Sequence, residues 1–157
     1  METVYILGAA RTPMGAMQGV LSSASASYLG GAAIAAAVAE SSVQVAHIDE
    51  LLMGCVLLAG QGQAPARQAG FFAGLGEDVP ATTINKMCGS GMKAAMMGFD
   101  QLALGASHMM VVGGMESMTQ APYLLPKMRD GARIGHSQVK DSMFLDGLED
   151  AYEEAVS

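Results

Sequence analysis

The 157-residue sequence has no tryptophan, and aromatic residues make up only 5% of it. Charged residues are also scarce, at 15%, whereas 51% of the residues are hydrophobic. A chain of this length and composition can bury a sizeable core and is not expected to be disordered. Because aromatics are few, the core has to be built from aliphatic residues, alanine and some of the 14 methionines, with 20 glycines allowing close approach of elements.

Basic residues are in deficit, with eight Lys and Arg against fifteen Asp and Glu and a net charge of −7. Neutralising phosphates requires an excess of Lys and Arg, so we do not expect a nucleic-acid partner. Four of the eight basic residues lie between Lys127 and Lys140. We interpret this basic group as part of a solvated loop.

No apolar run is long enough to cross a bilayer, since the longest nearly uncharged helical stretch is Tyr28–Ala39. The start, Met1-Glu2 followed at once by apolar residues, lacks the basic segment and cleavage site of a signal peptide. The two cysteines, Cys55 and Cys88, are too few for a disulfide framework or a cysteine metal site. We therefore expect a cytoplasmic protein with no metal and no membrane contact.

Strand-like and helical segments alternate along the first 116 residues. The segments that read as strands are Thr3–Leu7, Leu51–Leu57, Ala81–Ile84 and His108–Val112. Those that read as helices are Ser25–Glu40, Pro65–Ala73 and Ser90–Leu104. This alternation predicts an α/β fold with a parallel-rich sheet, covering helices and right-handed crossovers.

The third of these helices has few polar residues. Its strongly polar positions, Lys93, Asp100 and Gln101, fall on one narrow stripe, and nearly all the others are apolar. A helix that is apolar on most sides is buried on most sides. It requires a covering layer on both faces, which is more than one four-stranded sheet supplies.

The character of the sequence changes after Met115, where prolines and glycines punctuate a loop-like stretch. We place a boundary near residue 116. Beyond this stretch, a short acidic helix is indicated by one apolar face, made of Phe144, Leu148, Ala151, Tyr152 and Ala155.

The candidate for chemistry is Cys88, in the segment Asn85-Lys-Met-Cys-Gly-Ser-Gly91 between the third strand and the third helix. Sites in open parallel sheets form at the carboxyl ends of the strands. The partial positive charge of a helix N-terminus favours a thiolate, and its N–H groups can hold a developing oxyanion. A structural cysteine in a Gly-rich turn is the alternative, which the position alone leaves open.

The other cysteine and the histidines are weaker candidates. Cys55 lies inside a strand that is apolar on both faces, so we expect a small core residue. A nucleophilic cysteine needs a base. His47 and His108 precede strands, at the edge opposite the expected site, and only His136 on the later loop fits the topology. The residues thus indicate a nucleophile without an evident base.

Two further motifs have mainly structural interpretations. Gly60-Gln-Gly62 begins like a phosphate-binding loop, but the third glycine is absent and Pro65 follows, so we interpret it as a helix-entry turn. Glu116 follows the fourth strand at the same edge as Cys88. For Glu116 a structural anchor and a functional role both remain open.

The segment Asn85–Ala94 resembles the nucleophile segment of thiolases, the acetyl-CoA acetyltransferases. Other segments are similar to further parts of the same family, in the same order. They are the first strand and turn at Ile6–Gly15, the segment after the fourth strand at Gly113–Met118, and the start of the substrate-covering loop domain at Ala121–Pro126 and Asp141–Leu148. The resemblance covers almost the whole chain.

This resemblance implies that Cys88 accepts an acyl group from acyl-CoA as a thioester. A second thioester is then condensed onto it, or a 3-ketoacyl-CoA is cleaved in the reverse direction, as in fatty acid metabolism. The backbone amide of Cys88 would donate to an oxyanion. The family needs no metal and no bound cofactor, with coenzyme A thioesters as substrates, and its members form homo-oligomers, commonly dimers or tetramers. The CoA-binding residues of this chain stay unassigned.

The resemblance also implies what is missing. A thiolase is more than twice this long, and its second half supplies the activating histidine, a second cysteine and most CoA contacts. We therefore expect residues 1–116 to form the N-terminal α/β domain without its last strand, and residues 117–157 to begin the loop domain. The chain reads as a truncated thiolase or one piece of a split one, inactive alone. The alternative is a non-catalytic module that pairs with itself or with the missing half.

Overall fold

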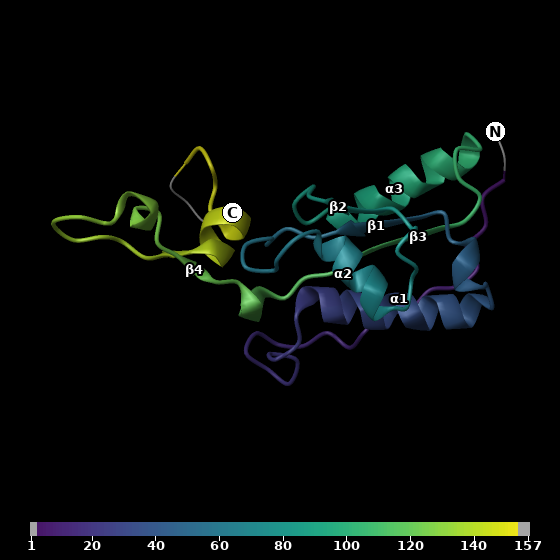
Figure 1. Ribbon diagram of the computed structural model, residues 1–157, viewed down its shortest axis with the longest axis horizontal. Coiled ribbons are helices and arrows are strands. Elements are labelled where there is room, and N and C mark those ends of the chain that lie inside the picture. The colour runs from purple at the N-terminus through teal and green to yellow at the C-terminus, as the bar shows by residue number, and fades with distance from the viewer. Residues whose placement is uncertain (1–2, 154–157) are drawn as a thin grey trace.

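The computed structural model describes residues 3–153, in which three helices and three strands alternate before a largely irregular region (Figure 1). The strands are β1 (Glu50–Gly54), β2 (Ala81–Ile84) and β3 (Met110–Gly114). The helices are α1 (Ala26–Ser41), α2 (Pro65–Phe72) and α3 (Ser90–Ala103). No helix in this described part of the chain is both long and apolar enough to cross a membrane.

The three strands form one parallel sheet in the order β2-β1-β3. In register, Leu51 of β1 lies beside Ala81 of β2 and Val111 of β3. Helices α1 and α2 lie below the sheet in Figure 1, and α3 lies above it. The sequence-based prediction of an α/β fold with a parallel-rich sheet and covering helices is confirmed.

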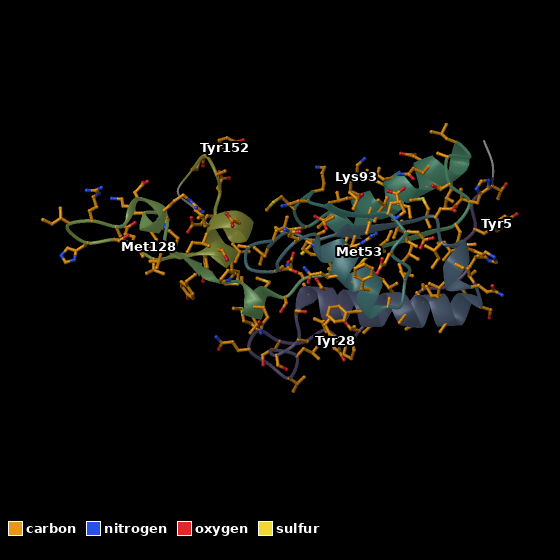
Figure 2. All side chains as sticks on the ribbon, viewed as in Figure 1. Tyr5, Tyr28, Met53, Lys93, Met128 and Tyr152 are labelled. Atoms are coloured by element: carbon orange, nitrogen blue, oxygen red, sulfur yellow. The ribbon has the colours of Figure 1, made fainter. Side chains whose placement is uncertain are left out.

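The core is centred on β1, the middle strand. Leu51, Leu52 and Met53 are at most 2% exposed, and Figure 2 shows Met53 in the interior between the helical layers. On the side of α1 and α2, Leu51 and Met53 join a cluster that includes Ile34 and Ala69. Burying each large aliphatic side chain stabilises the fold by about 1.5–3 kcal/mol.

A serine caps the start of α1, which was expected over Ser25–Glu40. The hydroxyl of Ser25 accepts a hydrogen bond from the N–H of Tyr28 at 3.1 Å and caps the helix. A glycine then allows α1 to approach α2 closely: a Cβ at Gly31 would overlap the Cβ of Phe72 and lie 2.9 Å from the carbonyl oxygen of Ala69. Small residues therefore determine the packing distance between these two helices.

The predicted first strand, Thr3–Leu7, is wrong. In the structure this segment belongs to no strand, and the side chain of Ile6 is 89% exposed. A strand exists only where a neighbour pairs with its backbone. Here a cavity of about 490 Å³, lined by both Thr3–Gly8 and β3, lies between the segment and the nearest sheet edge. The segment is apolar as a strand would be, but it has no partner.

Two strand boundaries differ from the predicted ones because carboxylate side chains accept hydrogen bonds from the backbone N–H groups at these positions. Leu51–Leu57 was expected as one strand, but β1 ends at Gly54, and the carboxylate of Glu116 accepts the N–H groups of Val56 and Leu57. His108–Val112 was expected as another, but β3 begins at Met110. The carboxylate of Asp49 accepts the N–H groups of the two residues before β3, at 2.6 and 2.9 Å.

The outer face of α3 has no covering layer within the described residues. The sheet covers one side of this helix, whereas Met92, Met96 and Phe99 are exposed. The sequence predicts that α3 is buried on most sides, whereas in the structure only the side that faces the sheet is covered. This leaves an apolar helix surface facing solvent.

Beyond β3 the chain leaves the sheet. A short antiparallel pair, β4 (Tyr123–Leu124) and β5 (Lys140–Asp141), closes a loop that extends far from the sheet (Figure 1). The short turns η1 (Val45–His47), η2 (Met118–Gln120) and η3 (Met128–Asp130) are 3₁₀, and η4 (Phe144–Leu148) is a π-helical turn.

The predicted acidic helix is wrong beyond Leu148. The carboxylate of Asp150 accepts the N–H groups of Tyr152 and Glu153, which forms a turn instead of a further helical turn. Tyr152 is 96% exposed, far from the core in Figure 2. Ala155, the last residue of the predicted apolar face, lies outside the described residues.

Candidate functional site

A cavity of about 440 Å³ lies at the carboxyl ends of the three parallel strands. One wall comes from Val56 and Leu57, which follow β1. Cys88, between β2 and α3, forms a second wall, and Met115 and Glu116 after β3 form a third. Met143 and the end of η4 also line the cavity. Cys88 therefore lies at the sheet edge where α/β folds place their ligands.

The turn that carries Cys88 is held by side chains on both sides of it. The side-chain oxygen of Asn85 accepts the N–H of Met87 at 3.0 Å. The hydroxyl of Ser90 accepts the N–H of Lys86 at 2.8 Å and donates to the carbonyl oxygen of Met87 at 2.5 Å. These bonds fix Met87 at a φ of 49°, a left-handed conformation that costs energy in a residue with a side chain. Cys88 follows, exposed, two residues before α3 begins.

Glycines bring the start of α3 directly onto the strand ends. A Cβ at Gly54, the last residue of β1, would lie 2.5 Å from the nitrogen of Gly91 and 2.7 Å from the Cβ of Ser90. A Cβ at Gly114, the last residue of β3, would lie 3.2 Å from the Cα of Gly91. The first turn of α3, and with it the position of Cys88, depends on the absence of side chains at these strand ends.

Glu116 connects the wall after β3 to the wall after β1. Its carboxylate accepts the N–H of Val56 at 2.8 Å and the N–H of Leu57 at 3.2 Å. The thiol of Cys55 lies 3.4 Å from the same carboxylate and donates to it. These contacts give Glu116 a structural anchoring role beside Cys88. From the sequence alone, a structural role and a functional role of Glu116 both remained open.

Cys55 is 1% exposed and belongs to the core, as the sequence predicts. Its surroundings are nevertheless polar, because the side-chain amide of Gln61 donates to its sulfur at 3.2 Å and to the carbonyl oxygen of Leu57 at 2.7 Å. Burial, with the nearby charge of Glu116, raises the pKa of the Cys55 thiol to about 12. Cys55 is therefore a protonated structural thiol.

Gln61 is the residue that sequence reasoning missed. Gly60 and Gly62 have φ values of 75° and 82°, which fits the predicted turn. They also turn the polar residue between them inward, toward Cys55. A glutamine flanked by two glycines before an apolar helix was the available signal.

The raised pKa of Cys55 predicts a loss of stability in alkali. An unfolded cysteine loses its proton above about pH 8.5, whereas the folded Cys55 keeps it up to about pH 12, so this contribution to stability is full below pH 8.5 and falls as the pH rises further. We expect the Cys55→Ser variant to lack this term. Between pH 9 and 11, its free energy of unfolding in urea should fall less steeply than that of the unmodified chain, by at most about 1.4 kcal/mol per pH unit. Equal slopes would contradict the assignment.

None of the described histidines lines the cavity that contains Cys88. The imidazole of His108 lies 3.8 Å from the carboxylate of Asp49, before β3, and His47 ends the turn η1. His136, the one candidate for a base, is exposed in the loop between β4 and β5, together with most of the basic group. Within residues 3–153, no cluster of three His, Cys, Asp or Glu side chains is suited to hold a metal ion.

Comparison with known proteins matches residues 4–157 to the family model described as "Thiolase, N-terminal domain". Acetyl-CoA acetyltransferase IB of Candida tropicalis is 49% identical over 155 residues, which is 98% of this chain and 38% of the relative. Acetyl-CoA acetyltransferase 2 of Arabidopsis thaliana is 49% identical over 95% of this chain and 37% of its own length. The acetyl-CoA acetyltransferase of Pseudomonas aeruginosa is 45% identical over 97% and 39%. The chain thus spans less than two-fifths of the length of these relatives.

Proposed function

Because the chain belongs to the thiolase family, through the N-terminal domain of that family, we propose that it carries the acyl-accepting cysteine of an acetyl-CoA acyltransferase. Cys88 is the proposed nucleophile. The observation that carries this proposal is the exposed Cys88, which lines a cavity of about 440 Å³ at the carboxyl ends of parallel strands and lies two residues before the start of α3.

In the proposed step, the sulfur of Cys88 attacks the thioester carbonyl of an acyl-CoA. A bond forms between this sulfur and the acyl carbon, and the bond from that carbon to the CoA sulfur breaks. The proton of the cysteine ends on the departing CoA thiol, so the step exchanges one thioester for another. The N-terminal end of α3 and the amide of Cys88 are suited to stabilise the oxyanion that forms in between.

The full reaction requires a catalytic base in addition to the groups that perform the acyl exchange. In condensation, a base removes an α-proton from a second acetyl thioester, and the resulting carbanion attacks the acyl carbon on Cys88. A carbon–carbon bond forms, the bond from the acyl carbon to the Cys88 sulfur breaks, and this sulfur takes a proton back to become a thiol. In the reverse direction, a 3-ketoacyl-CoA is cleaved by the thiol of CoA. No described histidine lines the cavity, so we propose that the described chain performs the acyl exchange without catalytic turnover.

We also propose that residues 1–116 form the α/β domain and that residues 117–157 begin a segment that covers the substrate. The support is that Met118, Met143 and Leu148, which all lie beyond the end of β3, line the same cavity as Cys88. The second candidate function is a pairing module without chemistry. The exposed apolar side chains of α3, Met92 and Met96 among them, favour it.

Incubation of the purified chain with acetyl-CoA tests the proposal. We expect one acetyl thioester per chain, located on Cys88 by peptide mass spectrometry and removed by hydroxylamine. Cys88→Ala should abolish this adduct, and Cys55→Ser, the control, should retain it. Formation of acetoacetyl-CoA should stay at the background rate in all three. A folded chain that acquires no acetyl group at Cys88 would favour the pairing module, and steady turnover would contradict the proposed lack of a base.

A further inference from the structure

Val56, the second residue after the end of β1, is hydrogen-bonded to both neighbouring walls of the cavity that contains Cys88. Its N–H donates to the carboxylate of Glu116, after β3, at 2.8 Å. Its carbonyl oxygen accepts a hydrogen bond from the side-chain nitrogen of Asn85, after β2, at 3.4 Å. One residue therefore connects the segments that follow all three strands of the sheet.

Asn85 extends this connection to the turn of Cys88. While its side-chain nitrogen donates to Val56, its side-chain oxygen accepts the N–H of Met87 at 3.0 Å. Met87 has a φ of 49°, and a residue with a side chain keeps such a left-handed conformation only where its surroundings hold it there. Cys88 follows directly, so the backbone of Met87 determines the direction of its side chain.

The end of the connection at Glu116 is the firmer one. The carboxylate also accepts the N–H of Leu57 at 3.2 Å, and hydrogen bonds to a charged acceptor are stronger than those between neutral groups. The bond from Asn85 to Val56, at 3.4 Å, is neutral and close to the limit of hydrogen-bond length. A small movement of Val56 would break it, so Asn85 depends on the carboxylate that fixes Val56.

The opposite end of the sheet contains the same kind of anchor without a thiol beside it. The carboxylate of Asp49, before β1, accepts the N–H groups of the two residues that precede β3, at 2.6 and 2.9 Å. Neither Asp49 nor these two residues line the cavity that contains Cys88. A carboxylate that joins two strand ends is thus a structural feature that this sheet uses twice. Glu116 differs from Asp49 in its onward connection to the turn of Cys88.

We propose that Glu116 is a positioning residue for the acyl exchange at Cys88. The carboxylate of Glu116 fixes Val56, and Val56 keeps the side-chain amide of Asn85 in place. Asn85 in turn holds Met87 in its left-handed conformation, which directs the sulfur of Cys88 into the cavity. Glu116 exchanges no atom with the substrate in this step. The inference rests on the proposed function of Cys88 and adds to it a contribution from the segment after β3.

The test measures the rate at which acetyl-CoA acetylates Cys88 in the full chain, at a temperature where every variant is folded. Glu116→Gln keeps the size of the side chain but has one acceptor oxygen, so it cannot accept the N–H groups of Val56 and Leu57 on separate oxygens. We expect the rate of acetylation to fall about tenfold. Asp49→Ala, the matched control, removes the other carboxylate anchor. It should lower the Tm and leave the rate unchanged.

A second variant tests whether the effect passes through Asn85. Asn85→Ala removes the hydrogen bonds to Val56 and Met87, and it should also slow acetylation about tenfold. In the Asn85→Ala chain, Glu116→Gln should then slow the reaction by less than about twofold, whereas independent effects would multiply to about a hundredfold. Multiplying effects, or an unchanged rate in Glu116→Gln alone, would overturn the proposal.

Hydrogen exchange at the amide of Met87 tests the connection without acyl chemistry. This N–H is bonded to Asn85, so its exchange should be about tenfold faster in Glu116→Gln and unchanged in Asp49→Ala. Unchanged exchange in Glu116→Gln would overturn the proposal even if acetylation slows, because the effect would not pass through the turn. An unmodified chain that takes up no acetyl group would instead contradict the proposed function of Cys88, and the exchange at Met87 would then decide whether Glu116 fixes the turn.

Discussion

At pH 8, iodoacetamide is expected to modify Cys88 at least about 100-fold faster than Cys55. Only the thiolate of a cysteine reacts, and the pKa of about 12 for Cys55 leaves roughly one thiol in ten thousand ionised at this pH. Burial adds to the protection, because Cys55 is enclosed in the core while Cys88 is exposed. The measurement is the rate of labelling at each cysteine, followed by peptide mass spectrometry.

Two cysteine variants and an unfolded sample serve as controls for the assignment of each rate to its cysteine. Cys88→Ser should show only the slow labelling of Cys55, and Cys55→Ser should label Cys88 at an unchanged rate. In 6 M guanidinium chloride the two cysteines should react at similar rates, because the native environment is lost. Similar rates in the folded chain would show that Cys55 is accessible and that the turn gives Cys88 no advantage.

The elements that sequence reasoning placed correctly depend on local signals. Ala81–Ile84 is a strand with the predicted bounds, and α1 begins and ends within one residue of the predicted helix Ser25–Glu40. The location of Cys88 follows from the same kind of information, since a strand, a short turn and a helix succeed one another within about twenty residues. For this reason the candidate nucleophile could be placed without any structure.

The elements that sequence reasoning missed depend on distant residues. Thr3–Leu7 has the composition of a strand, but pairing requires a neighbour, and none lies beside it among the described residues. The ends of β1 and β3 are determined by Glu116 and Asp49, which act on backbone groups about sixty residues away. No local pattern reports such contacts.

The candidate site likewise combines features that depend on local sequence with features that depend on distant residues. The thiol and its turn could be read from the segment around Cys88. The contacts among Cys55, Gln61 and Glu116 could not, because they join the segment after β1 to the segment after β3, about sixty residues away. From the histidine positions we predict no evident base beside Cys88, and the structure places His136 exposed on the loop between β4 and β5, outside the residues that line the cavity.

Gly54→Ala is expected to destabilise the chain and to displace the turn that carries Cys88. The added Cβ would lie 2.5 Å from the nitrogen of Gly91, and this neighbour is backbone, so no side-chain rotation relieves the overlap. Either β1 or the first turn of α3 has to move by about 1 Å to reach ordinary contact. Overpacking of this kind costs about 1–3 kcal/mol, which corresponds to a Tm lower by roughly 2–12 °C in a chain of this size.

Gly89→Ala is the matched control, because it adds the same methyl group to the same turn. A Cβ at Gly89 would meet nothing closer than the carbonyl oxygen of Lys86 at 3.5 Å, which is an ordinary contact. Gly89 is the N-cap of α3, where alanine is less favourable than glycine, so a loss of up to about 1 kcal/mol is expected there. Thermal unfolding by circular dichroism should therefore rank the unmodified chain first, Gly89→Ala second and Gly54→Ala last.

The labelling rate of Cys88 distinguishes a displaced turn from a general loss of stability. If the close approach of β1 to α3 positions the thiol, Gly54→Ala should change the rate of iodoacetamide labelling at Cys88 at a temperature where the variant is still fully folded. Cys55, on the buried side of the same strand end, should stay protected under those conditions. A Gly54→Ala chain as stable as Gly89→Ala, with an unchanged rate at Cys88, would mean that the strand end does not position the nucleophile. The position of Cys88 would then rest on the hydrogen bonds of Asn85 and Ser90 alone.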